Sequence, residues 1–117
     1  TGLVTLKVNA NNLTQFKAAN NTALETLWVS DNQLSAINVR SNTALKDLRM
    51  SNNVDITALN LKSNTALETL YADGLSISEI NLVENSGLSV ISLINNELLS
   101  LAYMWENPIK KVPMLQL

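Results

Sequence analysis

Apolar residues recur along this chain in a fixed frame of about 21 positions. The first three apolar columns are Leu3, Leu24, Leu45, Leu67 and Leu88; Leu6, Leu27, Leu48, Leu70 and Ile91; and Val8, Val29, Met50, Ala72 and Leu93. Consecutive units are 21 residues apart, or 22 where the third unit holds an extra residue between Asn53 and Ile56. Such a period predicts a repeat architecture, in which each unit buries its apolar face only against its neighbours.

A second apolar segment closes each unit. Its columns are Leu13, Leu34, Ile56, Ile77 and Leu98; Phe16, Ile37, Leu59, Ile80 and Leu101; and Ala18, Val39, Leu61, Leu82 and Tyr103. Alternation of apolar and polar positions is typical of a strand with one buried face. Two such segments per unit therefore predict two short parallel β-ribbons joined by bends, with little or no helix. We expect the inward columns, Ile37 and Leu59 included, to be buried.

Asparagine occupies two further columns. Asn11, Asn32, Asn53 and Asn96 follow the first segment, whereas Asn21, Asn42, Asn64, Asn85 and Asn107 open the "NTAL"-like phrase of each unit. In the second column the side chain is suited to cap the following turn. In the fourth unit Leu75 stands where the first column has Asn, directly after Gly74. Because Gly permits positive φ angles, we expect this bend to follow a different path.

The unit reads L-x-x-L-x-L-x-x-N-x-L-x-x-I-x-L and resembles the leucine-rich repeat, in particular the short bacterial class of about 21 residues. The resemblance covers nearly the whole chain. It implies that the Asn after the first strand points inward and bonds backbone groups of the bend, although not at Leu75. It also implies a secreted or cell-surface protein that binds partners through the outward face of the first strand of each repeat.

The repeats make one leucine-rich repeat domain over residues 1–117. Its units are 1–20, 21–41, 42–63, 64–84, 85–106 and a partial 107–117. The chain begins without Met and ends within the repeat frame, so we expect a fragment of a longer chain. Exposed solenoid ends favour aggregation. We therefore expect further chain or another subunit to cover at least one end.

Composition narrows the function. The chain has 46% hydrophobic residues, 15% charged residues and a net charge of −2. This balance gives no basic footprint for nucleic acid, and no apolar run is long enough to span a membrane. Cys and His are both absent, which removes thiolate nucleophiles, Cys/His zinc sites and the usual general base. The sequence predicts no catalysis, no metal site and no cofactor.

The outward positions of the first segment supply the candidate binding residues. One column reads Lys7, Trp28, Arg49, Tyr71 and Ser92. Parallel, in-register strands would place Arg49 between the rings of Trp28 and Tyr71, which favours cation–π contacts. Trp, Tyr and Arg are also enriched at binding hot spots. A surface ladder that satisfies only itself remains the alternative.

Two other groups of residues extend this interpretation. Asp47 and Asp73 offer weak support for a glycan-binding surface, because they supply acceptors beside the rings. Val90, Ile94, Trp105 and Met114 are outward or nearby apolar residues that indicate an interface at the C-terminal end. Three functions stay open: a protein-binding module, which is favoured, a glycan-binding surface, and a structural or accessory subunit of a larger cell-surface assembly.

Overall fold

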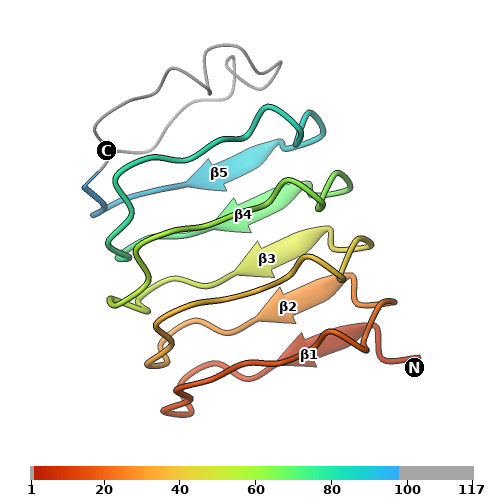
Figure 1. Cartoon of the computed structure of the whole chain (residues 1–117), viewed down its shortest axis with the longest axis horizontal. Helices are drawn as coiled ribbons and strands as arrows, with labels where there is room; N and C mark the ends of the chain where they lie inside the picture. Colours follow the sequence, from red (N-terminus) through yellow and green to blue (C-terminus); the bar gives the residue numbers. More distant parts are fainter. Residues whose placement is uncertain (1, 98–117) are drawn as a thin grey trace.

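The computed structural model describes residues 2–97, which form a parallel β-solenoid without a helix. Each turn contributes one three-residue strand. The strands are β1 (Thr5–Lys7), β2 (Thr26–Trp28), β3 (Asp47–Arg49), β4 (Thr69–Tyr71) and β5 (Val90–Ser92). They pair in chain order into a single five-stranded parallel sheet (Figure 1). The predicted leucine-rich repeat solenoid is therefore confirmed for these residues.

The strand register follows the apolar frame of the sequence. Leu6 pairs with Leu27, Leu27 with Leu48, Leu48 with Leu70, and Leu70 with Ile91. Side chains alternate between the faces of a strand, so this register turns one whole apolar column inward. The central residue of β2, β3 and β4 is accordingly fully buried.

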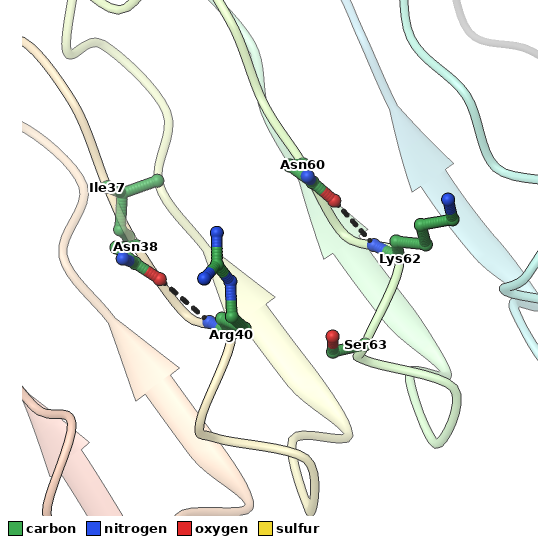
Figure 2. A pocket seen from close by; sticks show the side chains of 6 residues that line it. All are labelled: Ile37, Asn38, Arg40, Asn60, Lys62 and Ser63. Atoms are coloured by element: carbon green, nitrogen blue, oxygen red, sulfur yellow. Dashed lines mark hydrogen bonds between the residues drawn. The ribbon is translucent and has the colours of Figure 1, made fainter.

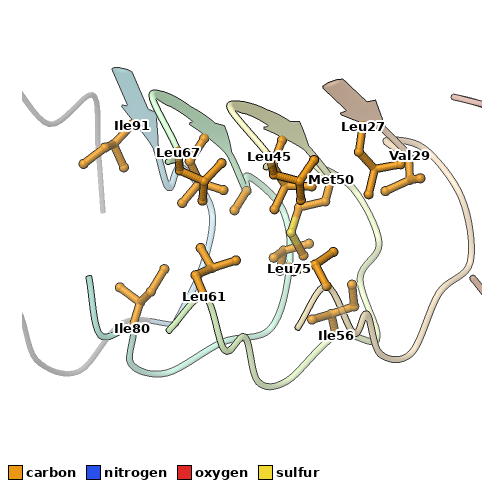
Figure 3. Close-up of a cluster of buried hydrophobic side chains, with 14 of the residues drawn as sticks. Leu27, Val29, Leu45, Met50, Ile56, Leu61, Leu67, Leu75, Ile80 and Ile91 are labelled. Atoms are coloured by element: carbon orange, nitrogen blue, oxygen red, sulfur yellow. The ribbon is translucent and has the colours of Figure 1, made fainter. Parts of the chain in front are cut away.

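The core lies between the sheet and the second segment of each turn. Figure 3 shows Leu27 and Leu67 on the sheet side, with Leu61 and Ile80 approaching from the opposite side. All of these side chains are buried. Ile37 and Leu59 were expected to be buried as well, but they are only half-buried. Their column borders surface grooves on the side away from the sheet, and these grooves keep part of each side chain accessible.

A ladder of inward Asn side chains links the bends that follow the strands. The amide nitrogen of Asn32 donates to the carbonyl of Val29 in its own turn, at 3.0 Å, and to that of Val8 in the preceding turn, at 3.1 Å. Its Oδ1 accepts two backbone N–H groups of the preceding turn, each at 2.9 Å. Asn53 likewise donates to the carbonyls of Val29 and Met50 and accepts the Leu34 N–H, so the inward role is confirmed for both residues. Asn11, in the first described turn, is exposed, and its side chain donates only to carbonyls of its own bend.

The second Asn column forms another inward ladder, which corrects the predicted capping role. Asn42, Asn64 and Asn85 are fully buried. The amide nitrogen of Asn64 donates to the carbonyls of Val39 and Asn42, both at 2.9 Å, and the other two Asn residues do the same in their turns. The bend itself closes through backbone bonds, such as Leu45 N–H to the Asn42 carbonyl at 3.2 Å. The side chain points inward because buried carbonyls require donors.

Leu75 interrupts the first Asn ladder without changing the path of the bend. The residue before each ladder position has a left-handed backbone, with φ of 58° at Ala10, 58° at Asp31, 62° at Asn52, 61° at Gly74 and 61° at Asn95. Gly74 therefore repeats the conformation of every other described turn, and the expected different path is wrong. Leu75 is 5% exposed and simply fills the interior space.

The second segment of each turn is not a regular strand in residues 2–97, which corrects the expectation of a second ribbon. Backbone bonds between turns are isolated there. The Oδ1 of Asn38 accepts the N–H of Arg40 at 3.0 Å, and Asn60 and Asn81 make the equivalent bond in later turns. These side-chain turns take backbone donors that a strand ladder would need. The solenoid thus has one ordered sheet face and one irregular back face.

Candidate functional site

The outer face of the sheet carries a stack of alternating cations and aromatic rings, here called the cation–aromatic row: Lys7, Trp28, Arg49 and Tyr71. The strand register places the four residues side by side. Lys7 Nζ lies 3.9 Å from the centroid of the Trp28 ring, and the guanidinium carbon of Arg49 lies 4.1 Å from it. The same carbon is 5.0 Å from the Tyr71 centroid. The predicted side-by-side geometry is confirmed, whereas a role in binding stays a prediction.

Asp47 fixes the orientation of Arg49 within this row. The Arg49 Nε and Nη2 groups donate to the two carboxylate oxygens of Asp47, at 3.0 and 3.2 Å. Two parallel bonds restrain a guanidinium plane better than a single contact does. The Arg49 plane is therefore held between the rings of Trp28 and Tyr71 before any partner arrives. The same bonds occupy both oxygens of the Asp47 carboxylate.

A second set of side-chain bonds runs beside the row, where the strands end. Asn9 Oδ1 accepts the N–H of Ser30 at 2.9 Å, and Ser30 Oγ accepts that of Ser51 at 3.1 Å. Ser51 Oγ then accepts the N–H of Asp73 at 3.0 Å, and Asp73 Oδ1 accepts that of Ile94 at 2.8 Å. The sequence prediction missed this ladder. Its signal was a short polar residue at the same frame position in four consecutive units.

The proposed C-terminal interface is only partly described. Val90 is exposed and Ile94 is half-buried, while Trp105 and Met114 lie outside the described residues, as does Asn107. Ser92, which lies between Val90 and Ile94 along the chain, is buried and donates its hydroxyl to Asp73. Asp73 therefore joins β4 to β5. Its carboxylate already has partners in the chain.

Charges of alternating sign stand directly before β2, β3 and β4 in consecutive turns: Glu25, Lys46 and Glu68. Lys46 Nζ lies 3.5 Å from Glu25 Oε1, and both side chains are about half exposed, at 52% and 45%. An exposed pair of this kind contributes little to stability, roughly 0–1 kcal/mol.

Within 2–97, no three His, Cys, Asp or Glu side chains come together as a possible metal site. Nor does this range include any helix with the length and apolar character needed to cross a membrane.

Two solved structures from Listeria monocytogenes share the fold. The functional domain of InlJ, described as including a cysteine ladder, is 24% identical and has a TM-score of 0.68 over 90% of this chain and 28% of that chain. The internalin InlF is also 24% identical, with a TM-score of 0.84 over 96% of this chain and 34% of that chain. No protein-family model and no curated protein matches the sequence.

These similarities show the fold, and they cover at least 90% of this chain. Together with the repeat frame and the single parallel sheet, they show that the chain has the leucine-rich repeat fold found in these internalins. The chain spans about a third of each of those two chains. It contains no cysteine. The ladders inside this solenoid are made of Asn side chains, and the ladder at the strand ends is made of Asn, Ser and Asp side chains.

Proposed function

We propose that this chain is a non-catalytic protein-binding module of a secreted or cell-surface bacterial protein, with the cation–aromatic row as its central contact. The observation that carries the proposal is the continuous stack from Lys7 to Tyr71, with distances of 3.9–5.0 Å between cations and ring centroids. Trp, Tyr and Arg dominate the energetics of many interfaces. The extracellular location rests on the repeat class and on the similarity to internalin structures.

The row is rigid before binding. Its side chains project from hydrogen-bonded strands, each ring has a cation against it, and Asp47 holds Arg49 in place. Side chains that are already ordered lose little entropy when a partner docks. The four strands span three sheet spacings, about 14 Å in total. This length suits a loop or a short segment of a partner protein.

The polar groups around the row favour a protein over a sugar. A sugar stacked on Trp28 or Tyr71 would need free acceptors beside the ring. Asp47 is engaged by Arg49, and Asp73 Oδ1 accepts the N–H of Ile94. Lys7, by contrast, is exposed and has no carboxylate partner among the described residues, so it can meet an acidic side chain of a partner.

The remaining parts of the proposal concern chemistry and the C-terminal end. The absence of Cys and His supports a non-catalytic role. The exposed Val90 and half-buried Ile94 support docking of this end against a further domain or subunit. An accessory role in a larger assembly would use that end without the row.

The test is capture of partners by the Trp28→Ala/Tyr71→Ala double variant. Immobilised wild-type protein is exposed to a mixture of extracellular proteins, and bound chains are identified by mass spectrometry and then titrated individually. We expect a partner whose affinity falls by tenfold or more in the double variant, about the effect of losing one hot-spot residue. A Val54→Ala/Val83→Ala variant is the control, because both residues are exposed and lie away from the row.

Unchanged affinity in the Trp28→Ala/Tyr71→Ala variant would show that the row is only a surface ladder. Equal losses in the double variant and in the control would point to a general defect rather than a contact site. Thermal unfolding of both variants separates that case, because Trp28 and Tyr71 are half-buried and their truncation can lower stability as well as affinity.

A further inference from the structure

The back face, opposite the sheet, carries shallow grooves between neighbouring turns. The groove between the second and third turns has a volume of about 400 Å³ and is lined by Ile37, Asn38, Arg40, Asn60, Lys62 and Ser63 (Figure 2). A groove of about 530 Å³ shares Asn60 and Lys62 with it, and one of about 280 Å³ shares Asn38 and Arg40. The three grooves therefore form a continuous band over the first four turns, here called the back-face groove.

The back-face groove holds cations without neutralising carboxylates over its first three turns. Arg40 and Lys62 occupy the same frame position in adjacent turns, and neither forms an ion pair with a described residue. Lys17 lines the adjoining groove on the N-terminal side. Like charges at neighbouring positions repel each other. Directly before the strands, the residues at one frame position in adjacent turns alternate in sign, as Glu25 and Lys46 do. Arg40 and Lys62, by contrast, are two unpaired cations at one frame position in adjacent turns.

The uncharged polar groups of the groove are donors as well. Asn38 and Asn60 have their Oδ1 atoms occupied by backbone N–H groups at 3.0 Å, which leaves their amide nitrogens for other partners. Figure 2 shows the Arg40 side chain extending between Asn38 and Asn60, while Lys62 points away from Arg40 toward the next turn. A guanidinium offers five N–H donors and an ammonium offers three, and neither can accept. Such a lining suits an oxyanion.

The floor of the groove adds an apolar component. Ile37 and Leu59 are half-buried and border the cations, and Phe16 does the same beside Lys17. Apolar C–H surface next to oxyanion donors matches a sugar ring that carries an acidic substituent. The cationic stretch ends in the fourth turn, where Val83 takes the frame position of Lys62 and Glu84 lines the groove.

We propose that the back-face groove binds an acidic polysaccharide across the first three turns, with Arg40 and Lys62 contacting its carboxylate or sulfate groups. The two steps between these turns cover about 10 Å at the sheet spacing, so more than one acidic unit is engaged. This site is on the opposite face from the cation–aromatic row. It stands or fails independently of the proposed protein-binding function.

The test compares polymers of known charge on the intact protein. Binding of dextran sulfate, polygalacturonate and uncharged dextran is measured by biolayer interferometry in about 0.15 M salt, where the Debye length is about 8 Å. We expect one or both acidic polymers to bind and uncharged dextran not to bind. The Arg40→Gln/Lys62→Gln variant should lose about tenfold or more in affinity, as expected when charge-assisted contacts are removed.

The matched control is Lys7→Gln/Lys46→Gln, which removes the same charge from the sheet side of the molecule. It should stay within about twofold of wild type, since exposed charges more than a Debye length away are largely screened. The charge-preserving Arg40→Lys/Lys62→Arg variant should keep binding. This variant also shows whether any loss in the Gln variant comes from charge or from misfolding.

Three results would overturn the proposal. The first is no binding of either acidic polymer to wild-type protein. The second is an equal loss in the back-face variant and the Lys7→Gln/Lys46→Gln control, which would show attraction by net charge alone. The third is equally tight binding of a single-stranded DNA oligomer that carries the same number of charges, which would show that the groove does not recognise sugar.

Discussion

At the scale of single residues, Asn side chains have different roles that depend on their place in the turn. Asn32 points inward and bonds backbone groups of two turns. Asn60 lies on the surface and accepts the N–H two residues ahead, while Asn52 donates to Asp31 across a turn at 2.8 Å. Only the inward Asn serves groups that water cannot reach. A buried donor or acceptor left without a partner costs about 1–3 kcal/mol.

This difference predicts the effect of Asn32→Leu. Leucine fits the interior, as Leu75 shows at the equivalent position, but it leaves backbone N–H and carbonyl groups without partners. We expect a loss of roughly 2–4 kcal/mol in unfolding free energy, measured by urea denaturation. Gln33→Leu is the control, because Gln33 is exposed beside Asn32 and should change stability by about 0.5 kcal/mol or less. Similar losses in the two variants would contradict the inward-ladder account.

At the scale of elements, the sequence predicted the sheet well and the back face poorly. The column containing Leu27, Leu48 and Leu70 determines the register, because shifting a strand by one residue would expose the whole column. The row from Lys7 to Tyr71 follows from that register. The second segment shows a similar apolar alternation, yet local side-chain bonds at Asn38 and its equivalents compete with strand pairing.

Other misses share one physical cause. The inward orientation of the Asn64 side chain and the ladder through Ser51 both depend on backbone groups of a neighbouring turn of the solenoid. That turn is 21 or 22 residues away in the sequence. Local rules for caps and turns consider only the nearest residues. The grooves around Arg40 were missed for the same reason, because they lie between turns rather than within one.

The sheet also predicts how core truncations depend on position. Leu48 lies in β3 with a leucine column neighbour on each side, whereas Leu6 lies in the edge strand β1 and is half-buried. Leu48→Ala should lower the unfolding free energy by about 2–5 kcal/mol, as truncations of buried leucines do. Leu6→Ala should cost roughly half of that or less, because less apolar area is lost. Equal costs in urea denaturation would argue against the observed burial gradient.

At the scale of the whole molecule, the solenoid presents two chemically distinct faces. In the cation–aromatic row both cations have partners in the chain: Lys7 lies against Trp28, and Arg49 lies against Trp28 and pairs with Asp47. On the back face Arg40 and Lys62 have no anionic partner among the described residues. Because both faces repeat with the same period, an extended ligand on either face would contact equivalent positions in successive turns.

Stacking by nearest neighbours gives the last prediction, which concerns the addition of a turn. Each strand pairs only with the strands directly before and after it, so an inserted turn that keeps the frame adds an interface without disturbing the others.

We compare a second copy of residues 21–41 inserted after residue 41 with a second copy of 64–84 inserted after residue 84. Both insertions are 21 residues long, but only the first carries an Asn of the first ladder, at Asn32, whereas the second carries Leu75 at that position. Both should raise the urea m-value by roughly a fifth, because more surface is buried in one cooperative unit. The 21–41 copy should also give the higher midpoint, since its Asn pairs backbone groups that Leu leaves unpaired. A lower midpoint for both, or two separate unfolding transitions, would show that the turns do not stack as independent and equivalent units.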